Sequence, residues 1–139
     1  HQVVLVIDVR SQPYSQWATQ FNRELLQHDL DAAGLHYRYM GHLLGGRPPN
    51  RDLYDPGQDH PDYLKMATDD TYLKGIDRLL ELASSQNLTI MCSEGDHHHC
   101  HRHLLITQTL VERGVDVLHI QPDGSLVASE LEPRQLSLF

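Results

Sequence analysis

The apolar residues along the chain predict strands and helices in alternation. Residues 3–7 form a continuous, mostly β-branched apolar run, typical of a strand buried on both faces of a parallel sheet. Residues 35–40 alternate between apolar and polar side chains, which predicts a strand with one wetter face. Residues 88–91 predict a second buried strand, and residues 115–120 a last one.

Helical spacing of apolar residues predicts three helices between these strands. The first spans residues 20–33, and Gly34 is placed to end it. The second has the clearest apolar stripe, over residues 72–83, with Asp69 and Asp70 as candidate caps and Gly75 as a weak point. The third covers residues 101–113. Residues 41–60 are rich in Gly, Pro, Asn and Asp and predict a long loop.

This order predicts an α/β domain whose mostly parallel sheet has about four strands, with helices on both faces. We expect residues 1–122 to form the domain and residues 123–139 to form a C-terminal tail. Ligands of such folds bind beyond the carboxyl ends of the strands. The residues that follow the first three strands should therefore line one pocket: Asp8, Val9, Arg10, Ser11, Gly45, Gly46, Arg47, Cys92, Ser93 and Glu94.

Charge and composition narrow the classes of function. The chain of 139 residues has a formal net charge of −8, so it matches a phosphate backbone poorly. Nucleic acid would have to be reached through a local cluster or a recruiting partner. No apolar run is long enough to span a bilayer and no signal peptide opens the chain. Two cysteines are too few for a disulfide framework, which favours a cytoplasmic protein.

The segment IMCSEGDHHHCHRHLLI, residues 90–106, holds both cysteines. Cys100 precedes a predicted helix, where free N–H groups favour a thiolate, and His101 and Arg102 would add to this effect. We expect Cys92, at the end of a buried strand, to be the more shielded cysteine. A nucleophile paired with Glu94 or Asp8 as proton carrier is one interpretation. Cysteine as simple core filling is the other.

Metal binding is a further alternative, because five of the eleven histidines lie in this segment. Structural zinc sites use closely spaced pairs of ligands, and seven residues separate the two cysteines. Cys92, Cys100 and a histidine could still meet in space and bind zinc or another divalent metal. The sequence spacing alone, however, does not identify any residue as a metal ligand.

Two shorter motifs follow the other strands. Asp8 and Arg10 lie two residues apart on an extended segment, so they either pair or both line the pocket. Gly45, Gly46 and Arg47 offer unhindered N–H groups beside a guanidinium, which suits a phosphate or carboxylate cradle as well as a plain turn. Their expected convergence with the cysteines favours a functional site.

The chain resembles the bacterial and archaeal family called domain of unknown function 488. The matching stretches are IDVRS, QFNRELLQHDLDAAGLHYRYMGHLLGGRP, DYLKMATDDTYLKGIDRLLELA, the cysteine segment and LVERGVDVLHIQPDG. The resemblance implies a Rossmann-like three-layer fold and draws attention to Cys92, Glu94, Cys100, His101 and Arg102, together with Asp8 and Arg10. Family members usually open with a strand ending in Ile-Gly-His-Ser and a helix, which this chain lacks; we expect residues upstream.

The last five residues are Gln135, Leu136, Ser137, Leu138 and Phe139. They resemble the pentapeptide by which bacterial polymerases and repair proteins bind the sliding clamp. An extended peptide of this kind places alternate side chains in apolar pockets, with Leu138 and Phe139 as anchors. Packing of the tail against its own domain is the alternative.

Two functions from different classes follow. One is a hydrolase or transferase of DNA repair or nucleotide processing, recruited by the sliding clamp. Its predicted catalytic residues are Asp8, Arg10, Cys92, Glu94, Cys100 and Arg102; its predicted ligand-binding residues are Ser11, Gly45, Gly46, Arg47 and His101. The other is a non-enzymatic module that senses oxidation or metal through its thiols.

Overall fold

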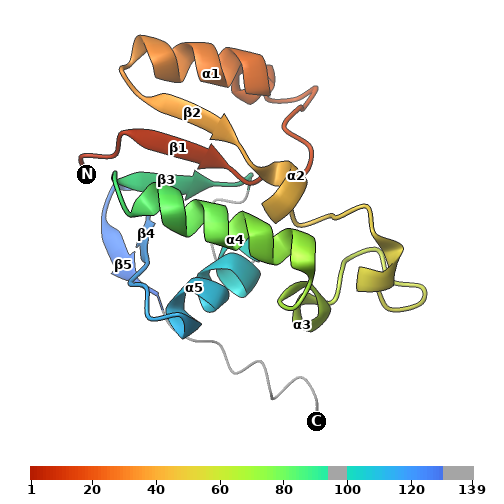
Figure 1. The fold of residues 1–139 in the computed structure, drawn as a ribbon. Coiled ribbons are helices and arrows are strands. Elements are labelled where there is room, and N and C mark those ends of the chain that lie inside the picture. Colours follow the sequence, from red (N-terminus) through yellow and green to blue (C-terminus); the bar gives the residue numbers. More distant parts are fainter. Residues whose placement is uncertain (94–99, 130–139) are drawn as a thin grey trace.

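A three-stranded parallel sheet lies at the centre of the computed structural model, which describes residues 1–93 and 100–129 (Figure 1). The strands lie in the order β2 (His36–Tyr39), β1 (Leu5–Asp8) and β3 (Leu88–Met91). All four residues of β1 are buried. The central strand has neighbours on both sides and cover on both faces, which explains its uninterrupted apolar sequence.

Helices of very different lengths surround this sheet. The long ones are α1 (Arg23–Ala32) and α4 (Asp70–Ala83); α2 (Gly41–Leu44) and α3 (Tyr63–Met66) are single turns. A π-helical segment (Arg102–Thr107) continues into α5 (Gln108–Glu112). Figure 1 shows α1 beside β2, and α4 and α5 together on the other side of the sheet.

The main core lies between the sheet, α4 and the helix that follows Cys100. Leu5, Ile7 and Val9 point into it from β1 and its end, and they meet Ile76 of α4 and Leu105. Asp8 alternates with them, and its side chain is buried on the opposite side of the strand. The sheet therefore separates an apolar core from a polar network around Asp8.

Two predicted helix ends agree with the structure, whereas the first helix begins at Arg23, after a separate 3-10 turn (Thr19–Phe21), and not at residue 20. The Asp69 side chain accepts a hydrogen bond from the N–H of Tyr72 at 3.1 Å and caps α4. Gly34 follows α1 with a φ of +84°, a left-handed conformation that glycine adopts without steric cost. The parallel α/β fold is thus confirmed.

The expected fourth strand is not part of the parallel sheet. Within residues 115–120 only β4 (Leu118–Ile120) is extended, and it pairs antiparallel with β5 (Leu126–Ala128) in a separate hairpin. The turn is stabilised by the Asp123 carboxylate, which accepts hydrogen bonds from the backbone N–H and the hydroxyl of Ser125. The first residues of the predicted tail are therefore half of a hairpin.

The predicted long loop over residues 41–60 also contains structure. It includes α2 and a 3-10 turn (Arg51–Leu53), and it buries Leu53 and Tyr54. Its glycines and prolines led to the loop prediction, whereas its few apolar residues anchor it to the core. In the described ranges 1–93 and 100–129, no helix has the length and apolarity needed to cross a bilayer.

Candidate functional site

Three loops meet beyond the carboxyl ends of the strands, as the alternation of elements predicts. The N–H of Arg47 donates a hydrogen bond to Ser11 Oγ at 2.9 Å. A Cβ on Gly45 would overlap this hydroxyl, and a Cβ on Gly46 would lie 2.8 Å from His101 Nδ1. Only glycine fits at positions 45 and 46, because Ser11 and His101 approach the backbone there too closely for a Cβ.

Arg47 does not complete an anion cradle at this point. Its guanidinium donates to the carbonyl oxygen of Asp59 at 2.9 Å, which ties it to the following loop. The backbone N–H and the guanidinium of Arg47 thus both stabilise the loop backbone. The geometry favours the plain-turn interpretation of the Gly-Gly-Arg motif.

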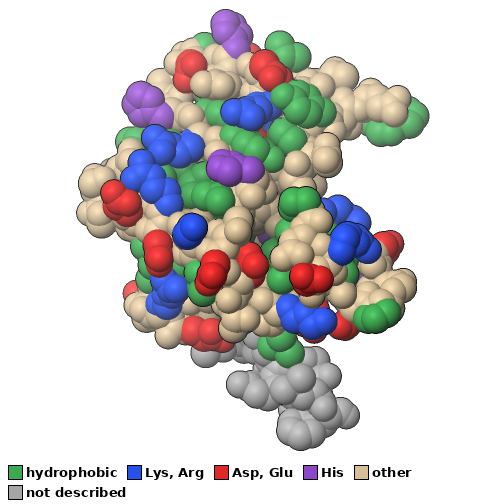
Figure 2. Space-filling view, turned by 45° about the vertical axis from the view of Figure 1, so that its right-hand side comes forward, with side chains coloured by type: hydrophobic (Ala, Val, Ile, Leu, Met, Phe, Trp, Pro, Cys, Tyr) green, Lys and Arg blue, Asp and Glu red, His purple; other side chains and the backbone are tan. Residues whose placement is uncertain are grey.

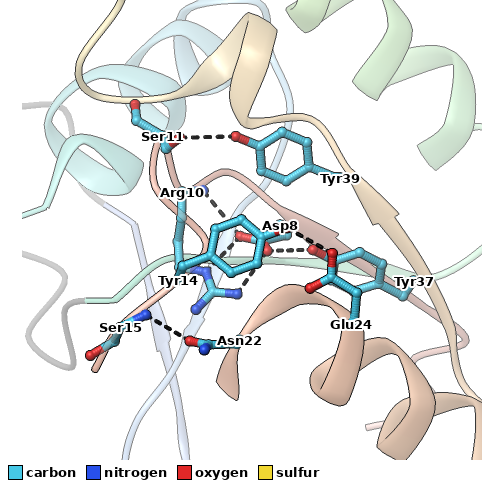
Figure 3. A network of polar contacts seen from close by, with 9 residues as sticks. All are labelled: Asp8, Arg10, Ser11, Tyr14, Ser15, Asn22, Glu24, Tyr37 and Tyr39. Atoms are coloured by element: carbon cyan, nitrogen blue, oxygen red, sulfur yellow. Dashed lines mark hydrogen bonds and ion pairs between the residues drawn. The ribbon is translucent and has the colours of Figure 1, made fainter. Parts of the chain in front are cut away.

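Asp8 and Arg10 form an ion pair inside a hydrogen-bond network (Figure 3). Arg10 donates from Nε and from its terminal nitrogen to the two carboxylate oxygens, each at 2.9 Å, and its backbone N–H donates as well. Tyr37 donates its hydroxyl to the same carboxylate at 2.5 Å. The Asp8 side chain has no exposure to solvent, and that of Arg10 is 11% exposed.

This network changes the acidity of its members. Burial raises the pKa of Tyr37 well above its usual range, and the hydrogen bond to Asp8 and the charge of Asp8 raise it further. The phenol therefore stays a hydrogen-bond donor. Tyr37 was not among the predicted site residues, although its place on the inner side of an alternating strand was the available signal.

Cys92 and Cys100 are joined by a disulfide bond. Cys92 directly follows β3 and is half-buried, whereas Cys100 is 3% exposed. The expectation that Cys92 is the more shielded cysteine is therefore wrong, because Cys100 lies under the start of the helix. Its sulfur accepts a hydrogen bond from the N–H of Arg102 at 3.4 Å, as expected for a helix entrance.

His101 links this disulfide to the end of β1. Its Nε2 lies 3.1 Å from the carbonyl oxygen of Val9, and its Nδ1 lies 3.7 Å from the Cys100 sulfur. A carbonyl only accepts, so Nε2 carries the hydrogen of the neutral ring and Nδ1 turns its lone pair toward the sulfur. Burial lowers the pKa of His101, which favours this neutral form.

The same three residues have the geometry of a metal-ligand cluster. The two sulfurs and one ring nitrogen of His101 all lie within 4.8 Å of one another. Thiolates and a neutral imidazole suit zinc and other thiophilic metals, and a histidine that binds metal usually donates its second N–H to a carbonyl. The disulfide and a metal exclude each other at the sulfurs, so ligation requires the reduced pair.

The Arg102 side chain is partly buried beside a different cavity. This cavity, of about 540 Å³, lies between β3, the end of α4 and β4, and His119 also lines it. Burial lowers the pKa of Arg102. The backbone N–H of Arg102 therefore contacts the Cys100 sulfur, while its side chain lines the cavity between β3, α4 and β4. Glu94 and Gln135 to Phe139 lie outside the described residues.

Comparison with known proteins adds a family. The family model described as "Domain of unknown function DUF488" matches residues 1–108, most of the 139-residue chain. The match includes β1, Gly45 and Gly46, the two cysteines and His101. No curated protein and no solved structure is significantly similar to the chain. The chain therefore belongs to the DUF488 family.

Proposed function

We propose that this chain is a thiol-based redox module in which Cys92 and Cys100 alternate between a disulfide and a reduced dithiol. The observation that carries the proposal is the disulfide itself, with His101 Nδ1 at 3.7 Å from the Cys100 sulfur. In a reducing cytoplasm, which composition favours, such a bond is transient and has a catalytic or sensing role rather than a structural one.

The two sulfurs have different tasks in this exchange. Cys92 is the more accessible, so an incoming thiolate attacks its sulfur, the S–S bond breaks and Cys100 leaves as thiolate. The N–H of Arg102 stabilises the negative charge. A second external thiolate then attacks the external sulfur of the mixed disulfide and releases Cys92. One protein disulfide and two thiols thus give a protein dithiol and one external disulfide.

In the reverse reaction, in which the protein disulfide forms again, His101 acts as the proton acceptor. Its neutral Nδ1 accepts the proton of the Cys100 thiol, which frees the thiolate to attack the mixed disulfide at Cys92. In the reduced form the same three ligands suit zinc, which would couple metal release to oxidation. The sensing alternative from the sequence is therefore the one that the geometry supports best.

Single-cysteine variants test this assignment. The lone Cys92 of a Cys100→Ser variant should react with a maleimide about tenfold faster than the lone Cys100 of a Cys92→Ser variant, because the burial of Cys100 limits access of the reagent more than its thiolate character helps. Equal rates, or a faster Cys100, would refute the asymmetric mechanism. Binding of Zn²⁺ to the reduced protein, measured by chelator competition, should weaken strongly in either variant and in His101→Gln.

Recruitment to DNA by the sliding clamp is a second proposal, and the sequence of residues 135–139 is what favours it. Under this proposal the redox site, or a nucleotide-processing activity of the same domain, is delivered to sites of DNA repair. The acidic chain fits such delivery because it needs no broad contact with phosphates. Asp8 is fully buried and bonded, so the chemistry proposed here does not pass through it.

Binding to the clamp of the same organism tests this second proposal. Deletion of residues 135–139 should abolish binding, and so should the double change Leu138→Ala and Phe139→Ala, which removes the anchors. Ser137→Asp is the matched control and should still bind, because it leaves both apolar anchors in place. Binding that survives the deletion, or is absent in the intact chain, would contradict the proposal.

A further inference from the structure

A basic cavity lies along the free edge of β2, apart from the cysteine site. It has a volume of about 450 Å³, within the range of small-ligand pockets. Its walls come from four elements or their ends: α1, β2, α2 and α4. The side chains that give it its character are Arg23, Arg38, Arg78, His42, Tyr37 and Tyr39.

The charge of this cavity is opposite to that of the chain. Three arginines line it, and among the described residues that line it there is no Asp or Glu. The whole chain carries a formal charge of −8. On the upper half of the face that it displays, Figure 2 shows Lys, Arg and His side chains around exposed hydrophobic ones, with Asp and Glu side chains toward the margin.

Nearby carboxylates neutralise this charge only in part. Glu81 pairs with Arg78 at 3.0 Å, but its side chain is 70% exposed, and such pairs contribute little. Glu24 accepts a hydrogen bond from Tyr14, and Asp8 lies behind Tyr37 with Arg10 as its own partner. Like charges brought together repel, so an anion in the cavity would relieve the repulsion.

One of these arginines, Arg23, is held in place by an aromatic ring. The guanidinium of Arg23 lies over the ring of Tyr39 at 4.6 Å, and the ring of His42 lies 5.8 Å from that of Tyr39. The hydroxyl of Tyr39 donates to the carbonyl oxygen of Ser11, which fixes the ring that supports Arg23. A planar guanidinium held on an aromatic face is well suited to bind phosphate oxygens in pairs.

We propose that this cavity binds the phosphate group of a small phosphate ester. Phosphate fits because it offers several charged oxygens to arginines that approach from three elements. A small ester is favoured over a long nucleic acid because the net charge of −8 repels a polyanion outside the cavity. The inference does not depend on the cysteine pair, and it concerns none of the residues that the sequence alone predicts for the site.

Calorimetric titration at low salt tests the proposal, with a nucleoside 5′-monophosphate, the same nucleoside without phosphate, and a single-stranded oligonucleotide of that base as probes. The monophosphate should bind and the nucleoside should not. Arg23→Gln and Arg78→Gln should each weaken binding about tenfold, since each removes a charge-assisted contact. Arg51→Gln is the matched control, because Arg51 also lies over a tyrosine ring, at 4.0 Å, but lines no part of this cavity.

Other results would overturn the inference. Equal binding of nucleoside and monophosphate would remove the role of phosphate, and equal loss in Arg51→Gln would place the effect elsewhere. Tight binding of the oligonucleotide alone would replace the small ester by a polymer. No binding of any probe would also contradict the proposal. Arg78, whose side chain is 42% exposed, can be changed without a loss of core packing, so Arg78→Gln remains informative if Arg23→Gln does not fold.

Discussion

At the scale of single residues, Asp8 holds the end of β1 through four hydrogen bonds from Arg10 and Tyr37. Asp8→Asn removes the charge and leaves the Arg10 guanidinium without its partner. We expect the free energy of unfolding, measured by urea denaturation, to fall by about 3 kcal/mol. The matched control is Asp55→Asn, which breaks an exposed pair with Lys65 and should cost less than about 1 kcal/mol. Equal costs would mean that the network contributes no more than a surface pair.

His101 predicts a specific dependence of stability on pH. Its pKa is lowered in the folded chain from an ordinary 6.5, so the unfolded chain binds the proton more tightly. Stability from this residue is present above about pH 6.5 and is lost as the pH falls below that value. His101→Gln, which keeps a donor for Val9, should flatten the pH dependence of the unfolding free energy below about pH 6.5. An unchanged slope would contradict the buried, neutral ring.

The sequence located the residues of the site better than it assigned their states. Residues 8–11 and the glycine pair follow from one rule, that parallel strands end at a common edge, whereas His101 was singled out by the helix entrance at Cys100 and by the family resemblance. The relative exposure of the cysteines did not follow, because it depends on how the next helix covers Cys100. Nor did Tyr37, whose hydroxyl reaches Asp8 only once β2 pairs with β1. Alternation along β2 marks Tyr37 as an inward-facing residue, but its contact with Asp8 depends on how the strands pair.

At the scale of elements, Gly75 shows packing overriding helix propensity. A Cβ at this position of α4 would lie 2.7 Å from Leu44 Cδ2 and 2.9 Å from Leu43 Cβ, so the glycine lets α2 approach α4. Propensity alone predicts that Gly75→Ala gains about 1 kcal/mol, whereas the contact predicts a net loss of about 1–2 kcal/mol. Thermal unfolding of this variant decides between them, with the exposed Lys74→Ala as control. A higher midpoint for Gly75→Ala would contradict the close packing.

The helix after Cys100 illustrates a limit of pattern reading. Apolar spacing predicts a helix over residues 101–113 but does not tell α-helical turns from π-helical ones. In the structure residues 102–107 are π-helical, and Thr107 and Gln108 donate side-chain hydrogen bonds to carbonyls five residues earlier. The hairpin of β4 and β5 is similar: its strand sequence was recognised, but its pairing partner lay in the segment expected to be a tail.

At the scale of the whole molecule, α2 connects the two proposed sites. Leu43 and His42 of this single turn line the phosphate cavity, while Gly46, just beyond it, touches His101. The cysteine site and the cavity therefore share one short element that is packed against α4. We propose separate functions for the two sites, and our main claim is that Cys92 and Cys100 form a reversible redox pair.

The most direct test of that claim is a redox titration of the intact chain. The protein is equilibrated in mixtures of reduced and oxidised glutathione, and its free thiols are counted by maleimide labelling and mass spectrometry. The account predicts that Cys92 and Cys100 lose their thiols together in one reversible two-electron transition, with no lasting glutathione adduct. Two free thiols in every mixture, or stable adducts on one cysteine, would contradict it.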